Sequence, residues 1–357
     1  MMTLPKVRWT ATTNRPVSPE PNHMKMSVST VSSLLLLVLA GCNTAPDAAD
    51  SSDQPQREAA EPAAAVDPLT AVVWKSRVVP DIVYRRVDDV DVKLDVWVPD
   101  TWLGESPWWK PATGKKPTLL FIHGGGWVEG TRHSMVLNFL PFLVRDWVVV
   151  NIEYRLAGTA KAPAAVADCL AALEWVHDNA EEYHVDTSRV VVCGGSAGGH
   201  LALLTGLLQK GDRLCGGKLV VGDKPAVAAI INWFGVPDYQ AHSKFHTDLS
   251  GTPDPWLDPK DDFEEAVRTL SPIHYINKSS VPVLTIHGTE DPAVLPAQAE
   301  LLRQELDSHG VKNRLHWVEG RKHGDFSPEE RTEIHRVIWD FLSDVDVLPN
   351  QENTRSE

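Results

Sequence analysis

The chain has 357 residues, enough for one large α/β domain or two small ones, and 43% of them are hydrophobic, so a sizeable core is available. Lys and Arg number 34 against 48 Asp and Glu, which gives a formal net charge of -14 at pH 7. Because phosphate binding needs a basic surface, this charge argues against a nucleic acid partner. Only three of the 4 Cys fall in the main domain, so no complete disulfide framework is expected.

Residues 1–41 have the pattern of an export signal, with the natural start expected at Met24 or Met26. One basic residue, Lys25, precedes a short apolar run and a group of small residues. The run is too short to cross a membrane as a helix. The segment therefore predicts export from the cytoplasm.

The apolar run ends in Leu39-Ala40-Gly41-Cys42, and this segment resembles the lipobox of bacterial lipoproteins at all four positions. The resemblance implies that Cys42 carries a lipid and anchors the protein to a membrane of a bacterial cell envelope. An ordinary cleaved signal, with Cys42 incidental, is the alternative. Residues 42–70, rich in Ala, Asp and Pro, are expected to form a disordered tether.

Residues 71–347 have the pattern of one α/β domain, which a polar tail at 348–357 follows. Alternating apolar residues predict an antiparallel hairpin over 82–98. Further strands are expected at 118–122, 147–152, 190–193, 227–232, 283–286 and 314–318, and helices at 134–145, 164–180, 201–208, 297–308 and 329–342. This alternation predicts a mostly parallel central sheet flanked by helices on both faces, with the hairpin at its start.

The sequence Gly194-Gly195-Ser196-Ala197-Gly198 stands between a buried strand and a helix. The pattern is that of a nucleophile elbow, in which the serine lies at the strained apex of a sharp turn. Side chains at the outer glycines would clash in so tight a turn, and the helix N-terminus favours the negative charge that develops there. Five residues alone are also compatible with a plain structural loop, and the flanking strand and helix favour the elbow.

A serine hydroxyl is a poor nucleophile until a neighbouring base takes its proton. In parallel sheets the functional groups lie beyond the carboxyl ends of the strands. His323, in the loop before the last helix, is the candidate base. Asp291, after the strand at 283–286, is the candidate acid, with Glu290 as its rival. The order Ser196, Asp291, His323 is that of the α/β-hydrolases.

A glycine-rich loop, His123-Gly124-Gly125-Gly126-Trp127, follows the strand at 118–122. Esterases and lipases use such a loop to aim backbone N–H groups at the oxyanion. We expect the N–H groups of Gly124, Gly125 and Ala197 to form the oxyanion hole. His123 is expected to be a structural residue rather than a base.

Residues 80–345 resemble the α/β-hydrolase superfamily, in the carboxylesterase branch that includes hormone-sensitive-lipase-like esterases and bifunctional acetylxylan and feruloyl esterases. The resemblance rests on four motifs in family order: His123-Gly124-Gly125-Gly126-Trp127, Tyr154-Arg155-Leu156, Gly194 to Gly199, and His287-Gly288-x-x-Asp291-x-x-Val294. Two departures favour the polysaccharide-esterase side of this branch. Gly195 stands where the hormone-sensitive-lipase-like pattern has Asp, and Ala157-Gly158-Thr159 stands where that pattern has Ala-Pro-Glu.

These motifs predict a serine carboxylester hydrolase that acts on short-acyl esters, including acetylated or feruloylated polysaccharide. No metal or organic cofactor is expected, and the sequence does not indicate an oligomeric state. One alternative is a serine peptidase of the same fold, although such enzymes often carry an N-terminal propeller for which the tether leaves no room. The other is a non-catalytic binding protein of this fold, which would usually have lost the serine or the histidine.

Two tryptophans are expected to line the substrate pocket. Trp127 ends the glycine-rich loop, and Trp233 and Phe234 follow another strand end. The alternative is that these tryptophans belong to the core and that the enzyme is a generalist. Aromatic walls favour short acyl groups, and exposed ring faces suit sugars on the alcohol side. Residues 235–280, a long polar and proline-rich connection, are expected to cover part of this pocket.

Overall fold

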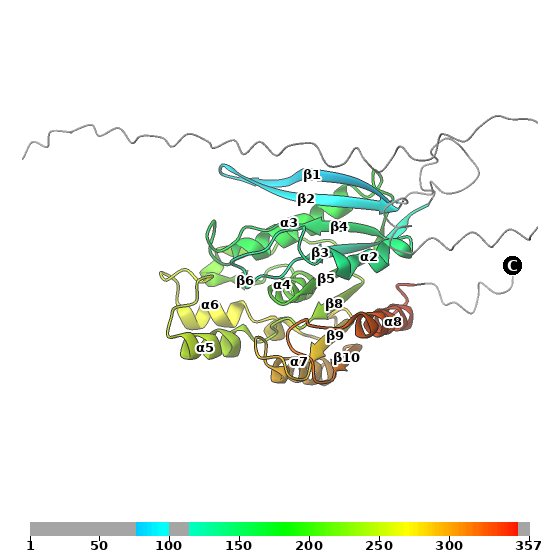
Figure 1. Cartoon of the computed structure of the whole chain (residues 1–357). Coiled ribbons are helices and arrows are strands. Elements are labelled where there is room, and N and C mark those ends of the chain that lie inside the picture. The colour runs from blue at the N-terminus through cyan, green and yellow to red at the C-terminus, as the bar shows by residue number, and fades with distance from the viewer. Residues whose placement is uncertain (1–75, 100–113, 349–357) are drawn as a thin grey trace, which may run out of the picture. The chain divides into compact units, whose positions relative to one another are not determined.

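An eight-stranded sheet runs through the part of the chain that the computed structural model describes, residues 76–99 and 114–348 (Figure 1). All of these residues belong to one unit, Ala64–Glu357. The strands in spatial order are β1 (Ser76–Val87), β2 (Val90–Pro99), β4 (Val148–Ile152), β3 (Lys116–Ile122), β5 (Val185–Gly195), β8 (Ala229–Trp233), β9 (Val283–Gly288) and β10 (Asn313–Val318). The predicted export signal, Cys42 and the tether lie outside the described residues.

The pairing of the strands confirms the predicted architecture. β2 pairs antiparallel with β1 and with β4, and the remaining neighbours are parallel. The predicted hairpin is present and begins earlier than expected, at Ser76. A separate pair of very short strands, β6 (Arg213–Leu214) and β7 (Leu219–Val220), was not predicted, because two residues are too few to show a period.

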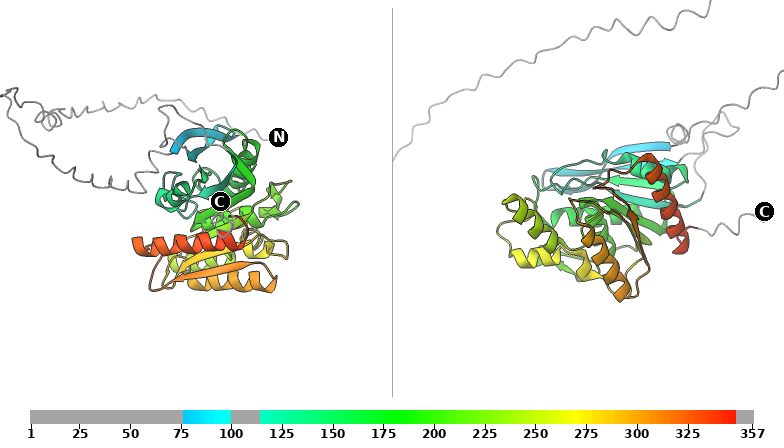
Figure 2. Two further views of the ribbon diagram at one scale, coloured as in Figure 1. Left: turned by 90° about the vertical axis from the view of Figure 1, so that its right-hand side faces the viewer. Right: turned by 60° about the horizontal axis from the view of Figure 1, so that its bottom comes forward.

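Helices cover both faces of the sheet. The helices on one face are α3 (Ala164–Asp178), α4 (Ala197–Leu207) and α7 (Pro296–Ser308), and those on the other are α2 (Val136–Val144) and α8 (Pro328–Asp344). Figure 2 shows the last two helices, α7 in orange and α8 in red, against the C-terminal strands. No helix within residues 76–99 and 114–348 is both long and apolar enough to cross a membrane.

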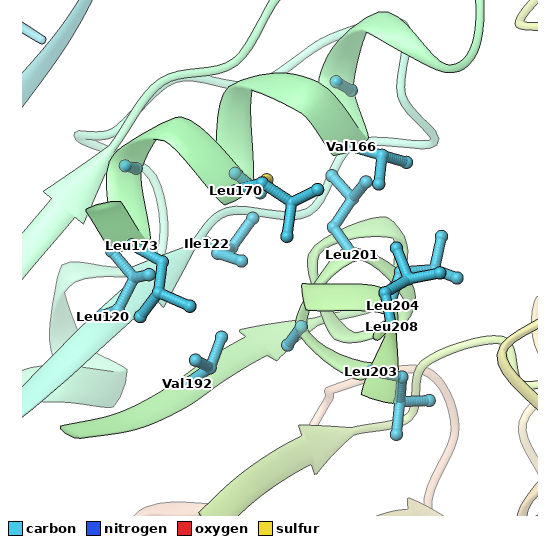
Figure 3. Packing of buried hydrophobic residues seen from close by; sticks show 14 of the residues in the cluster. Leu120, Ile122, Val166, Leu170, Leu173, Val192, Leu201, Leu203, Leu204 and Leu208 are labelled. Atoms are coloured by element: carbon cyan, nitrogen blue, oxygen red, sulfur yellow. The ribbon is translucent and has the colours of Figure 1, made fainter. Parts of the chain in front are cut away.

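The alternation of side chains along each strand divides the core in two. Leu120 and Ile122 of β3 belong to the cluster under α3 and α4, whereas Leu119 and Phe121 belong to the cluster under α2 and α8. Figure 3 shows the first cluster, with strand side chains packed against leucines of α3 and α4. Every residue of α4 is buried, so this helix is held from all sides. The elbow at its N-terminus therefore stands on a rigid base.

Residues 235–280 contain more regular structure than the sequence predicted. The segment forms α5 (Tyr239–Ser250), α6 (Phe263–Thr269) and a 3-10 turn, η2 (Pro272–Tyr275); another such turn, η1 (Cys215–Gly217), lies between β6 and β7. Asp238 caps α5 and Asp262 caps α6, each accepting a backbone N–H of the first turn. Only Tyr239 and Ser243 of α5 are buried, so the helix has too few buried apolar residues for the sequence to reveal it.

Candidate active site

Ser196 lies at the apex of the turn between β5 and α4. Its backbone has φ 58 and ψ -122, a conformation that is rare and strained for a residue with a side chain. A Cβ at Gly194 would lie 2.3 Å from the carbonyl oxygen of Gly198, and one at Gly198 would lie 2.2 Å from the carbonyl oxygen of Ile122. Glycine is thus required at both positions, because the strand and the helix touch through backbone atoms.

The structure brings Ser196, His323 and Asp291 together in one hydrogen-bonded row. The Oγ of Ser196 lies 2.8 Å from Nε2 of His323, and Nδ1 of His323 lies 2.6 Å from Oδ2 of Asp291. With Nδ1 protonated, the imidazole donates to the carboxylate and accepts from the serine hydroxyl. Asp291 is buried, whereas the rival carboxylate Glu290 is exposed.

The surroundings of Asp291 favour its charged form. Its Oδ1 accepts the N–H groups of Ala293 at 2.8 Å and Val294 at 3.0 Å. His287 places Nε2 3.4 Å from its Oδ2. Burial raises the pKa of Asp291, but the hydrogen bonds from His287, from His323 and from Val294 outweigh burial and hold this pKa well below its usual range. The carboxylate is therefore ionised at any pH near neutral.

The glycine-rich loop lies directly beside the elbow. A Cβ at Gly124 would lie 3.4 Å from Cβ of Ser196 and 2.7 Å from the carbonyl oxygen of Gly195. Gly125 has φ 121, and a Cβ there would lie 2.0 Å from the carbonyl oxygen of Glu129. Ala197 is the first residue of α4, so its N–H has no acceptor within the helix. The three expected oxyanion donors thus belong to backbone that flanks Ser196.

His123 is a structural residue beneath this loop. Its ring stacks on Tyr154 with centroids 4.3 Å apart, and its Nδ1 donates to the carbonyl oxygen of Gly124 at 2.7 Å. Burial lowers the pKa of His123 to about 4, against a smaller opposite effect of that hydrogen bond. The ring is therefore neutral in working conditions and is turned away from the chemistry.

Of the two tryptophans expected in the substrate pocket, Trp127 lines the cavity above Ser196 and Trp233 does not, and neither presents a free ring face to a substrate. Trp127 touches the cavity, but its ring is 6% exposed, stacks on Trp256 with centroids 4.8 Å apart, and donates Nε1–H to Nδ1 of His200 at 3.3 Å. Trp233 is 1% exposed and does not line the cavity. Alternation along β8 directs its ring to the α8 face of the sheet, and the next residue, Phe234, lines the cavity instead.

A cavity of about 1130 Å³ opens above Ser196. The glycine-rich loop, the start of α2, the loop around His323 and one side of α5 form its wall. The insert at 235–280 therefore covers part of the pocket, as expected, through His242 and His246 of α5. Within residues 76–99 and 114–348, no group of three or more His, Cys, Asp or Glu is arranged to hold a metal ion.

Arg331 of α8 fastens the loop that carries His323, and sequence reasoning missed it. Its guanidinium donates to the carbonyl oxygens of Gly324 at 3.1 Å and Phe326 at 3.2 Å, and to Oδ1 of Asn138 in α2 at 2.9 Å. These acceptors are all carbonyl or amide oxygens, so the role of Arg331 here is to bridge backbone and amide groups. The only available signal was a basic residue early in the last helix, which is too common to single out.

Arg132 anchors the other side of the site, just after the glycine-rich loop. It forms ion pairs with Asp81 at 2.7 Å, with Asp95 at 2.8 Å and with Glu153 at 2.6 Å. Asp81 reaches it from a bulge in β1, where its φ is 61. The loop is thereby tied to β1, to β2 and to the segment after β4.

The strand order and the strained Ser196 between β5 and α4 define the class: the chain has the α/β-hydrolase fold. The model of the BD-FAE family matches residues 109–306, more than half of the chain. The chain belongs to this family. The matched segment includes Ser196 and Asp291 and ends before His323.

Known esterases are similar to this chain. The esterase LipC of Mycobacterium tuberculosis is 31% identical over 237 residues, which cover 62% of this chain and 54% of LipC. The chain spans about half the length of the curated relatives it matches.

Among solved structures, the esterase Est2 of Thermogutta terrifontis is 25% identical with a TM-score of 0.58, covering 78% of this chain and 95% of Est2. Est2 has also been solved bound to propionate, bound to butyrate and phosphorylated by paraoxon. A truncated carbohydrate esterase from gut microbiota shares the fold, with 24% identity, a TM-score of 0.61, and coverage of 75% of this chain and 97% of that one.

Proposed function

We propose that this protein is a serine carboxylester hydrolase. The observation that carries the proposal is the row of hydrogen bonds from Ser196 Oγ through His323 to Asp291 at the wall of an open cavity. Such a row activates a hydroxyl that is otherwise a weak nucleophile. The esterases among the relatives support the same chemistry.

In the first half-reaction, Oγ of Ser196 attacks the ester carbonyl carbon while Nε2 of His323 takes the hydroxyl proton. Asp291, kept ionised by its hydrogen bonds, stabilises the imidazolium that forms. The carbonyl oxygen becomes an oxyanion, and the N–H groups of Gly124, Gly125 and Ala197 are the donors we assign to it. The bond to the alcohol oxygen then breaks, and His323 returns the proton to the leaving alcohol.

In the second half-reaction, water replaces the alcohol. His323 removes a proton from the water, which attacks the acyl carbon and forms a second tetrahedral oxyanion. When this oxyanion collapses, the bond to Ser196 Oγ breaks and His323 protonates that oxygen. The products are a carboxylic acid and the regenerated hydroxyl, so the cycle needs no other reactant.

The acyl group that we propose is short. Gly195 has no side chain, and the methyl of Met135 fills that space, since a Cβ at Gly195 would lie 2.5 Å from it. Phe234 packs against the ring of His323 with centroids 4.6 Å apart. Both side chains line the cavity beside Ser196. The Est2 structures with propionate and butyrate support an acyl group of this size.

We propose that the alcohol portion of the substrate is linked to a glycan.

We also propose that the protein acts outside the cytoplasm, with a lipid on Cys42 as its membrane anchor. Cys42→Ser should then abolish lipidation and leave a soluble or unprocessed protein. Mass spectrometry of the mature N-terminus tests this, and an unmodified Cys42 or a mature start elsewhere would contradict it.

The substrate proposal is tested with p-nitrophenyl esters of increasing chain length alongside acetylated xylan. We expect the highest kcat/KM on acetate to butyrate esters, together with acetate release from the glycan. A maximum at chains of about eight carbons or more, with no acetate released, would contradict the short-acyl proposal.

A further inference from the structure

A second hollow of about 250 Å³ adjoins the cavity above Ser196. The two share Gly126, Trp127, His242 and His246 in their walls, so the second hollow lies behind the end of the glycine-rich loop. We call it the side hollow. Its remaining wall is mainly polar and comes from α5 and the segment after it: Ser243, Thr247, Ser250, Thr252, Asp254 and two prolines.

His242 stands on the boundary between the two spaces. It is half-buried, and its ring lies edge-on to Trp127 with centroids 6.0 Å apart and close to His246 with centroids 4.4 Å apart. His246 has a protein partner, because its Nε2 donates to the carbonyl oxygen of Ala293 at 2.9 Å. Among the described residues, the ring of His242 has no hydrogen-bond partner. A half-buried imidazole that faces two cavities without a partner has a donor and an acceptor to offer to a ligand.

The charge state of His242 narrows the chemistry of that ligand. Burial above all, together with the neighbouring His246, His200 and His323, lowers the pKa of His242 to about 3, against a smaller opposite effect of Asp254. A neutral imidazole carries one N–H and one lone pair, so it does not select an anion. A hydroxyl group, which both donates and accepts, is its natural complement.

The side hollow does not offer a stacking platform for a ring. Trp127 is covered by Trp256 on one face and is 6% exposed overall. Recognition in this hollow must therefore come from hydrogen bonds rather than from ring stacking. A polar, hydroxyl-lined space of this volume suits a fragment with several hydroxyls.

We propose that the side hollow is a subsite for the alcohol portion of the substrate, and that His242 hydrogen-bonds a hydroxyl of a polyhydroxylated alcohol such as a sugar. This inference rests on the proposed esterase function and deepens it. It assigns the glycan side of the substrate to α5, rather than to the tryptophans that the sequence had suggested.

The test compares two acetate esters with rings of similar size, a monoacetylated methyl xyloside and cyclohexyl acetate. The measured quantity is the ratio of their kcat/KM values, from acetate release. We expect His242→Leu to lower the xyloside-to-cyclohexyl ratio about tenfold, the effect of one lost hydrogen bond. His242→Gln, which keeps a donor and an acceptor, should lose less. Thr247→Leu, which fills the side hollow from another position, should lower the same ratio.

The matched control is Lys244→Gln on the same helix. Lys244 is exposed, pairs with Asp248 and lines neither space, so its ratio should equal that of the wild type. Ratios within twofold of wild type in both His242→Leu and Thr247→Leu would overturn the subsite. If the wild type hydrolyses neither ester, the proposed esterase function itself is contradicted, and the subsite proposal, which rests on it, is contradicted as well.

Discussion

The two loops that flank Ser196 are held in different ways. The glycine-rich loop is fixed by its backbone, by the buried ring of Trp127 and by the ion pairs of Arg132. The loop of His323 is held mainly by polar contacts: His323 with Asp291, the guanidinium of Arg331 with backbone carbonyls, and Arg321 with Glu330. Phe234 also packs against the ring of His323. The oxyanion side is thus fixed by close backbone packing and buried groups, whereas the base is positioned mostly by polar contacts.

The largest effect is expected at the base itself. His323→Ala and Asp291→Asn should each lower kcat by about 10⁴-fold, because the first removes the base and the second favours its wrong tautomer. Glu290→Gln is the matched control, since Glu290 is exposed. Steady-state kinetics on an aryl acetate measures all three. If Glu290→Gln lost most of its activity while Asp291→Asn kept its activity, the catalytic acid would be Glu290 and not Asp291.

The next largest effect tests the backbone of the glycine-rich loop. Gly125→Ala places a Cβ 2.0 Å from the carbonyl oxygen of Glu129, so the loop must move and kcat should fall about 10²-fold. Gly126→Ala is the control: Gly126 also has positive φ, 57, but a Cβ there meets nothing closer than 3.8 Å. Equal losses in the two variants would mean that positive φ, not crowding, sets the effect.

Acid should lower the stability of the protein through its buried neutral histidines, two of which lie around the glycine-rich loop. Burial lowers the pKa of His123, beneath the loop, and of His200, beside Trp127, to about 4 each. Between this pKa and the unfolded value of about 6.5, the unfolded chain binds more protons, so stability falls as pH falls. Each histidine should cost about 2 kcal/mol of unfolding free energy at pH 5. Asp291 acts oppositely: its pKa is lowered, so its contribution persists above about 3.9 and does not change in this window.

Unfolding midpoints from pH 7.5 to 4.5 measure this effect. His123→Asn, whose side chain does not titrate, should show a shallower fall than the wild type, whatever its stability at pH 7.5. Parallel curves for the two proteins would show that His123 is not among the groups responsible.

Removing the guanidinium of Arg331 should make the position of the catalytic base, His323, less well defined. Arg331→Met loses three hydrogen bonds to Gly324, Phe326 and Asn138, and we expect kcat to fall about tenfold with KM within about twofold. Arg331→Lys, which keeps a donor, should recover part of the loss. A rise in KM at constant kcat would indicate that Arg331 binds substrate rather than positions His323.

The smallest effect is expected at Trp127. Trp127→Phe keeps an aromatic ring against Trp256 and loses the hydrogen bond to His200 together with part of the buried ring volume. We expect about 1 kcal/mol lower stability, from chemical denaturation, and kcat within about threefold of wild type. If Trp127→Phe lowers kcat more than Arg331→Met does, the contrast between the two loops is reversed.

The sequence predicted the sheet and the central residues of the site because their signals are local. Alternation marks β2, a short apolar run marks β3, and the glycines around Ser196 mark a turn in which backbone touches backbone. Asp291 and His323 each follow a strand, so topology alone brings them to one edge of the sheet.

Other contacts depend on orientations that no local pattern encodes. Arg331 bonds the nearby loop through Phe326 and Gly324, but its bond to Asn138 depends on where α8 lies relative to α2. His242 belongs to a helix whose buried face carries few apolar residues. Trp233 ends a strand next to the site, yet alternation in β8 sends its ring into the core. In each case the deciding factor is the direction of a side chain on an element whose packing is set elsewhere in the chain.

The central claim is that Ser196 is a nucleophile activated by His323. The most direct measurement is covalent labelling by a fluorophosphonate, followed by mass spectrometry of the labelled peptide. The account predicts one label per chain, on Ser196, with labelling lost in Ser196→Ala and strongly slowed in His323→Ala. A label on another residue, or an unlabelled wild type that is folded, would contradict it.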